Sequence, residues 1–450
     1  MVDVLADPRR WFREIERFIL QGKFLGQIEQ CFGRQAQAKK TQNRNGNPFK
    51  MKMNTEEKSK RDCASDAVRS LACLLVMAHH AFQSFPPSSS KIATMVSRFF
   101  VAGNAGVAVF FVLSGALLST PFWKNWFDGK EMPSLKIFYI RRLSRIAPAF
   151  WLNIIVCYLV SAYLLSLTPQ FGLMRLLAGI TFISGFSFLT LFPTDINGPL
   201  WSISFEIVSY GLLSLGALML FKKRGDRTLK SALKFWGGFG FFVAVVHILF
   251  LIFLRPSAAT VYPNSSVITA AKNFWPEYNP VGFFLFFLLG ILTSGVSESA
   301  KRTRAISANA SGYIPDLIVT LGAFIVALLL LGMHEFSSPY FSIPPLPYLF
   351  PVFPLFFSLF LVFVPYSVVW KKVFENKAFY YLSTLSYGLY LWHNLFLTLV
   401  PRLPMVSKIT NMYLTWIVVT GISYFAALVV AAVSWKYFEK PILSLAHKFK

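Results

Sequence analysis

The sequence contains repeated apolar runs that are about as long as a helix must be to cross a lipid bilayer. Clear examples are residues 67–85, 99–118, 235–254 and 314–333, separated by turns or charged clusters. With 55% hydrophobic and 14% charged residues, the chain has too little polar surface for a water-soluble globule. Sustained alternation of apolar and polar residues, the pattern of a transmembrane β-barrel, is missing. We therefore predict an all-α fold, a polytopic bundle of transmembrane helices.

The formal net charge of +24 raises the question of nucleic-acid binding. The basic residues, however, flank the apolar runs and do not form a basic face interleaved with aromatic residues. We interpret them as topology signals and contacts with membrane lipid, and we expect no nucleic-acid partner. The four cysteines lack the spacing of metal ligands, so no metal site is expected.

The basic clusters also predict which connections between spans face the cytoplasm. They lie at 141–145, 222–227, 301–304, 371–377 and 436–450. For the first two clusters to share a side, the chain must cross the membrane an even number of times between them. Three apolar segments occur in that interval, and the middle one, residues 171–192, is the most polar. We predict that this segment is re-entrant or interfacial, which gives about ten spans with both termini cytoplasmic in the cell membrane.

Three parts of the chain are expected. Residues 1–60 form a basic N-terminal extension, disordered or lying on the membrane surface, and residues 61–442 form the membrane domain. Residues 443–450 form a short cytoplasmic tail. The oligomeric state stays open.

Ionisable residues inside a span usually face the interior of the bundle and mark functional positions. In the first span, Asp66 and Arg69 stand at the inner end, and His80 follows Arg69 by eleven residues. Eleven residues bring His80 to within about 20° of the Arg69 face and roughly 16 Å further along the axis. His79 points about 100° away from His80 and is the weaker candidate. The alternative is a histidine that only bonds a neighbouring carbonyl.

The segment FYIRRLSRIAP places Arg142 and Arg145 on one helical face, where we expect the third helix to begin. Guanidinium groups near a helix N-terminus suit phosphate groups, because the donors and the helix dipole both favour anions. An ordinary cytoplasmic anchor is the other interpretation.

Two further segments carry polar groups within spans. Glu206 follows Trp201 at the outer end of a span, with Tyr210 one turn later, and a buried carboxylate there needs a partner. His80 or a substrate hydroxyl could serve, unless Glu206 faces water. In FFVLSGALLS, the Ser114–Gly115 pair more often allows close helix packing than it provides a nucleophile.

A later span, LSTLSYGLYLWHNLF, is dense in hydrogen-bonding groups. Tyr387, Tyr390, His393 and Asn394 occur within about two helical turns. We interpret Tyr390, His393 and Asn394 as substrate-binding candidates, with polar contacts between helices as the alternative.

These segments together resemble the acyltransferase-3 family of integral-membrane acyltransferases. The matching pieces, in family order from about Asp66 to Ile442, are SDAVRSLACLLVMAHH, AVFFVLSG, FYIRRLSRIAP, PLWSISFEIVSY, LSYGLYLWH and SWKYFEKPI. The family's Arg and His in the first span match Arg69 and His80, and its paired-arginine motif matches Arg142 and Arg145. Its Trp-Ser…Glu motif matches Trp201 and Glu206, although the residues after Glu206 depart from the usual pattern.

The resemblance implies transfer of an acyl group, most often acetyl, from cytoplasmic acyl-CoA to a hydroxyl of a carbohydrate or another acceptor. In that scheme His80 is the general base on the acceptor hydroxyl and Glu206 orients or charge-balances it. Arg69, Arg142 and Arg145 bind the co-substrate, while Asp66, Tyr210, Tyr390, His393 and Asn394 contact substrate. A transient acyl-histidine is a variant of this mechanism.

Two other classes of protein fit the same features. A transporter or flippase for a lipid-linked saccharide could use Asp66, Arg69, His80 and Glu206 to relay protons or bind cargo. No internal repeat is visible, which argues mildly against a transporter. A structural or sensory membrane protein would need fewer polar groups within its spans.

Overall fold

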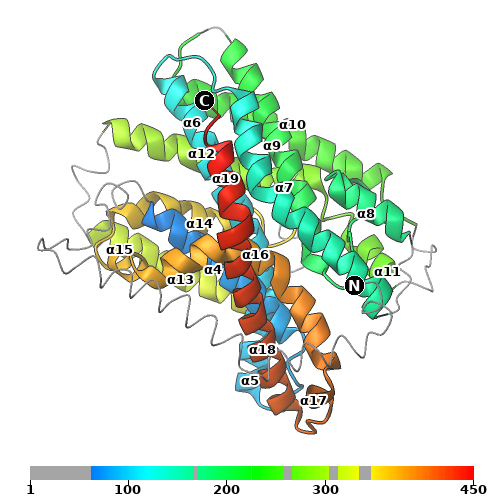
Figure 1. The fold of residues 1–450 in the computed structure, drawn as a ribbon. Helices are drawn as coiled ribbons and strands as arrows, with labels where there is room; N and C mark the ends of the chain where they lie inside the picture. The colour runs from blue at the N-terminus through cyan, green and yellow to red at the C-terminus, as the bar shows by residue number, and fades with distance from the viewer. Residues whose placement is uncertain are drawn as a thin grey trace, which may run out of the picture. The chain divides into compact units, whose positions relative to one another are not determined.

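The computed structural model describes residues 62–165, 171–223, 225–257, 266–303, 313–333 and 346–449. All regular elements in this part of the chain are helices, and it has no β-strand (Figure 1). The predicted extension 1–60, with its surface-binding stretch, lies outside the described residues.

Within the part of the chain that the structure describes, seven helical segments are long and apolar enough to span a membrane. Their helices are α6 (Gly106–Phe127, which continues the segment begun by α5, Lys91–Val101), α7 (Leu135–Leu159), α9 (Trp201–Lys222), α10 (Leu229–Phe253), α12 (Pro280–Thr303), α13 (Tyr313–Gly332) and α18 (Met412–Ser434). The prediction of an all-α polytopic bundle is therefore confirmed, and the protein is an integral membrane protein.

Three more helices complete the set that the sequence predicts to cross. Helices α4 (Cys63–Phe82) and α16 (Lys377–Leu399) have the length of a span but carry more polar side chains. Helix α14 (Val352–Phe363) is apolar and short. The count of ten crossings and the assignment of the two sides stay predictions.

The segment predicted not to cross contains one short helix, α8 (Gly172–Ile180). Nine residues of α-helix extend only about 13 Å, less than half the hydrocarbon thickness. A partly buried ion pair ties the segment to the residues that follow it, because Arg175 Nη1 lies 2.6 Å from Asp195 Oδ1. Arg175 Nε also donates to the Phe192 carbonyl oxygen at 2.8 Å. The segment thus folds back on itself.

Shorter helices connect or follow these elements. They are α11 (Ser266–Phe274), α15 (Val369–Phe374), α17 (Pro404–Ser407) and α19 (Lys440–Ala446).

Helices α6 and α12 approach each other very closely at the centre of the membrane domain. A Cβ atom at Gly115 would clash with the Phe287 carbonyl oxygen, and one at Gly290 would clash with the Val112 carbonyl oxygen. Small residues at both positions let the two backbones touch, as in other membrane-helix pairs. This contact fixes the rotation of α6 about its own axis.

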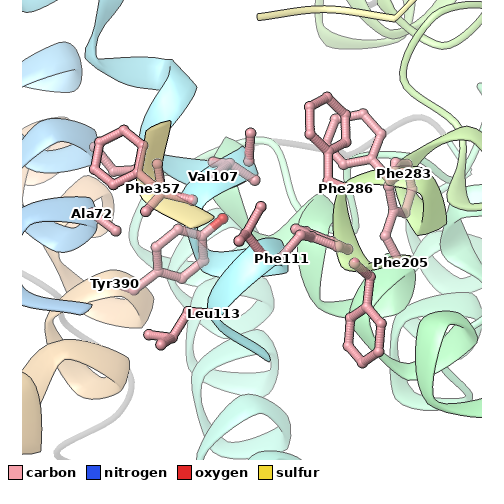
Figure 2. Packing of buried hydrophobic residues seen from close by; sticks show 14 of the residues in the cluster. Ala72, Val107, Phe111, Leu113, Phe205, Phe283, Phe286, Phe357 and Tyr390 are labelled. Carbon is pink, nitrogen blue, oxygen red and sulfur yellow. The ribbon is translucent and has the colours of Figure 1, made fainter. Parts of the chain in front are cut away.

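Aromatic side chains fill the core beside that contact (Figure 2). The Phe283 ring of α12 lies 5.3 Å from both Phe111 of α6 and Phe205 of α9, measured between ring centroids. Edge-to-face pairs at such distances pack well and add to the apolar burial. These contacts pack α6, α9 and α12 against one another.

Helices α4 and α16 also pack side by side, but through polar contacts. Ser383 Oγ donates to Asp66 Oδ1 at 2.6 Å, and Ser70 Oγ donates to the Phe379 carbonyl oxygen at 3.0 Å. Hydrogen bonds of this kind join membrane helices where water is absent. This pair of helices carries most of the residues that sequence analysis marked as functional.

Candidate active site

A cavity of about 100 Å³ lies between α4, α6, α7, α9 and α16. Six of the predicted site residues line it: Arg69, Arg142, Arg145, Glu206, Tyr210 and Tyr390. They come from four helices that are far apart in the sequence. We call this cavity the arginine pocket.

Arg142 and Arg145 project into the pocket from the middle turns of α7 and not from its first turn. Helix α7 begins at Leu135 with Ser134 as its N-cap, so Arg142 and Arg145 lie in the second and third turns. The expectation that they flank a helix N-terminus is therefore wrong, because Leu135–Ile140 adds helix before them. Their spacing still puts both side chains on one face. Arg141, which does not line the pocket, instead donates to the Phe449 carbonyl oxygen at 3.4 Å.

The pocket carries an excess of positive charge. Three arginines face one carboxylate, that of Glu206. Among the described residues, none of the three guanidinium groups forms an ion pair with a carboxylate, in contrast to Arg175 and Arg302 elsewhere. Guanidinium groups in a cavity with their donors free suit an anionic or strongly polarised ligand.

Glu206 projects from the second turn of α9 and is the hydrogen-bonding centre of the pocket. Its Oε1 atom accepts from Tyr210 Oη at 2.6 Å and from Ser114 Oγ at 3.0 Å. Of the two partners considered for Glu206, His80 and a substrate hydroxyl, His80 bonds other groups and is not paired with Glu206. The physical reason is that α9 faces α6 at this level, which brings the carboxylate to Ser114 first.

Two tyrosines of α16 form another wall. Tyr387 donates to the Ile146 carbonyl oxygen at 2.7 Å, and Tyr390 donates to the Pro199 carbonyl oxygen at the same distance. The Tyr390 hydroxyl also lies 2.5 Å from Ser202 Oγ. The Tyr390 ring faces the apolar layer around Ala72 and Leu113 (Figure 2). Both phenols are thus anchored by backbone and side-chain partners.

A second polar centre lies where the last turn of α4 meets α16. The imidazole rings of His80 and His393 are 4.9 Å apart between centroids. Nδ1 of His393 lies 2.9 Å from the Tyr390 carbonyl oxygen, so Nδ1 carries the proton and Nε2 accepts. Nδ1 of His80 lies 2.8 Å from the Val76 carbonyl oxygen and 3.3 Å from His393 Nε2. His80 therefore donates through Nδ1, which leaves its Nε2 as a free base in the neutral ring.

The two centres are separate but connected through α16. Arg69 and His80 share α4, about 16 Å apart along the axis. Tyr390 lines the arginine pocket, and its ring centroid lies 6.1 Å from that of His393. Tyr390 therefore stands between the pocket and the histidine pair.

The remaining predicted residues do not line the pocket. Asp66 accepts from Ser383 and joins α4 to α16, as described above. Asn394 Nδ2 donates to the Ile196 carbonyl oxygen at 3.5 Å, so it holds α16 against the residues that precede α9. His79 contacts the Val101 carbonyl oxygen and does not join the His80–His393 hydrogen bond. Sequence reasoning assigned Ser114 to packing, whereas its hydroxyl lies in the pocket.

Comparison with known proteins agrees with this architecture. A family model described as an acyltransferase domain matches residues 64–436, which is most of the chain. The chain belongs to the acyltransferase-3 family.

Two relatives illustrate the similarity. Peptidoglycan O-acetyltransferase OatA of Listeria monocytogenes is 25% identical over 413 residues, which cover 87% of this chain and 57% of OatA. A candidate O-acetyltransferase of Staphylococcus aureus strain COL is 23% identical over 349 residues, which cover 73% of this chain and 49% of that protein. The chain thus spans about half the length of the curated relatives it matches. No solved structure shows significant similarity.

Proposed function

We propose that this protein is a membrane O-acyltransferase that moves an acyl group, most often acetyl, from cytoplasmic acyl-CoA to a hydroxyl of a carbohydrate or glycoconjugate. The observation that carries the proposal is the arginine pocket, in which free guanidinium groups surround a carboxylate that is hydrogen-bonded to hydroxyl groups. Family membership and relatives named as O-acetyltransferases support the same class of reaction.

The depth of the pocket suits the thiol arm of coenzyme A. Arg69 lies six residues from the start of α4, or about 9 Å, and Tyr210 lies twelve residues from the end of α9, or about 18 Å. If the pantetheine arm of coenzyme A has the same length per bond as an extended peptide chain, it spans about 15 Å when fully extended. A thioester can therefore reach the pocket while the bulky nucleotide stays at the cytoplasmic end of the bundle.

The volume of the pocket also suits the acylated end of the coenzyme A arm. Sites for whole drug-sized ligands usually measure roughly 300–1,000 Å³, whereas this cavity measures about 100 Å³. It suits an acyl group and the end of the arm. Arg142 and its neighbours would then hold the donor and stabilise the negative charge that develops on the thioester oxygen.

The histidine pair is proposed to serve the acceptor. His80 Nε2 has the free lone pair that a general base needs, and His393 fixes the tautomer through Nδ1 of His80. The acceptor would approach from this side, opposite to the donor. Tyr390 would then separate the donor pocket from the acceptor until transfer.

The rival function is a proton-coupled transporter or flippase of a lipid-linked saccharide. One experiment separates the two. Purified protein in detergent is given acetyl-CoA with a labelled acetyl group and a soluble chito-oligosaccharide as acceptor. We expect CoA release and labelled oligosaccharide without any sealed compartment. A protein that is inactive in detergent, yet moves saccharide across sealed vesicles without acetyl-CoA, would overturn the enzyme assignment.

A further inference from the structure

The rotation of α6 places Ser114 in the arginine pocket. Gly115 packs directly against the backbone of α12, so its neighbour Ser114 points about 100° away from that contact. That direction leads to Glu206 on α9, whose Oε1 atom accepts the Ser114 hydroxyl proton at 3.0 Å. The close packing of Gly115 therefore explains why the serine is aimed at the carboxylate.

Ser114 differs from the other aliphatic hydroxyls that line the pocket. Ser202 is paired with Tyr390, and Ser386 donates to the Ser383 carbonyl oxygen. Ser114 alone among these three serines donates to a carboxylate. A hydroxyl within hydrogen-bond reach of a base is the arrangement of an activated nucleophile.

The surroundings of Ser114 also suit acyl transfer. The guanidinium groups of Arg69, Arg142 and Arg145 line the same cavity and can stabilise a tetrahedral oxyanion. The ester of a serine is chemically close to the ester of a sugar hydroxyl, so it can be loaded by a thioester and unloaded to an alcohol.

We infer that Ser114 is a covalent carrier, which takes the acyl group from acyl-CoA with Glu206 as its general base before the group passes to the acceptor. This inference rests on the proposed function, because it takes acyl-CoA as donor.

In the loading step, the Ser114 hydroxyl gives its proton to Glu206 and its oxygen attacks the thioester carbonyl carbon. The new C–O bond forms, the C–S bond breaks, and coenzyme A leaves as thiolate. In the unloading step, the acceptor hydroxyl gives its proton to His80 and its oxygen attacks the acyl carbonyl carbon. The bond to Ser114 breaks, and the serine oxygen regains the proton from Glu206. His80 then releases its proton to water, and no oxidant or metal is required.

The competing role for Ser114 is to position Glu206 without being acylated. A positioning serine would affect the rate, but it would never carry the acyl group. The test must therefore detect the covalent bond itself.

The full-length protein, purified in detergent, is incubated with acetyl-CoA in the absence of acceptor, quenched in acid and analysed by peptide mass spectrometry. We expect one acetyl group on the peptide that contains Ser114, removed when chito-oligosaccharide is added before the quench. Ser114→Ala should lose this acetyl group and about 1,000-fold or more of the transfer rate, as for other lost nucleophiles. Ser119→Ala is the matched control on α6, because Ser119 Oγ donates to the Ala116 carbonyl oxygen outside the pocket.

Ser114→Cys guards against a folding defect in the alanine variant. It should form a thioester that neutral hydroxylamine cleaves. Transfer by the wild type with no acetyl group on Ser114, or with the group on His80 or a tyrosine, would overturn the inference while leaving the proposed function intact. Complete failure of the wild type to consume acetyl-CoA would instead overturn the proposed function, and the carrier role with it.

Discussion

The arginine pocket and the His80–His393 pair both include residues of α4 and α16, yet they are built differently. The pocket contains space, three guanidinium groups and a carboxylate that bonds hydroxyl groups. The histidine pair is a neutral chain whose Nδ1 atoms donate to backbone carbonyl groups. The first centre is suited to hold and polarise a charged donor, whereas the second is suited to accept a single proton.

This difference indicates where the donor is bound and where the acceptor hydroxyl is deprotonated. A charged site inside a membrane domain is costly unless it serves a ligand, and the pocket has the free donors for one. A neutral histidine with a fixed tautomer costs much less and still offers a base. The following variants test whether the two centres have these separate roles.

Glu206→Gln should have the largest effect. Glutamine keeps the size of the side chain and can still accept from Ser114, but it cannot take up a proton. We expect acyl transfer to fall by about 100- to 10,000-fold, the usual contribution of a general base. CoA release in detergent measures the rate, and Glu298→Gln on α12, outside the pocket, serves as control. Near-normal CoA release by the Glu206→Gln variant would show that Glu206 is not the general base and that the pocket is not the site of acyl transfer.

His80→Ala should impair transfer to the acceptor by roughly 100-fold, because the base for the acceptor hydroxyl is lost. Consumption of acetyl-CoA in the loading step should continue, which would separate the two centres directly. Labelled acceptor and covalently bound acetyl are measured in parallel. His79→Gln is the control, since glutamine can still bond the Val101 carbonyl oxygen that His79 contacts. Transfer at the wild-type rate by the His80→Ala variant would show that His80 is not the general base for the acceptor hydroxyl.

Arg142→Ala should weaken binding of the donor and spare the acceptor. A hydrogen bond to a charged group contributes about 1.5–3 kcal/mol, which corresponds to an apparent KM for acetyl-CoA that is higher by roughly 10- to 100-fold. Steady-state kinetics with varied donor measure the change. Arg141→Ala is the control: it removes a neighbouring arginine that lies outside the pocket, and it should leave the KM for acetyl-CoA unaltered. Equal effects of the two variants would show that general positive charge, and not the pocket, binds the donor.

Gly290→Ala should have the smallest effect on chemistry and acts mainly on stability. The added methyl group would meet the Val112 carbonyl oxygen and push α6 away from α12. Overpacking of this kind costs about 1–3 kcal/mol, so thermal unfolding in detergent should begin at a lower temperature. Gly238→Ala, at an exposed position of α10 with open space around it, should be neutral or stabilising. An unchanged unfolding temperature for the Gly290→Ala variant would mean that α6 is not held by this contact.

Much of the fold and of the site follows from local properties of the sequence. Hydrophobic runs of span length predict the helices, because each run must satisfy its own backbone in lipid. Helical phase alone put Arg142 and Arg145 on one face, and both line the pocket. The short α8 agrees with the prediction that its segment does not cross.

Other features depend on how the helices are rotated against each other. The start of α7 at Leu135 does not follow from the apolar pattern, because Arg141, Arg142 and Arg145 interrupt the apolar run within the helix. The sequence likewise suggested His80 or a substrate hydroxyl as the partner of Glu206, and only the packing of α6 against α9 revealed Ser114 in that role.

The sequence by itself determined the class of fold and the residue types available for chemistry, because hydrophobicity and helical period act over a few turns. The tertiary structure decided which of those residues share a cavity. Close contact between Gly115 and α12 sets the direction in which Ser114 points, and that contact joins residues more than a hundred positions apart. Such packing depends on the shapes of two surfaces at once, which no single stretch of sequence contains.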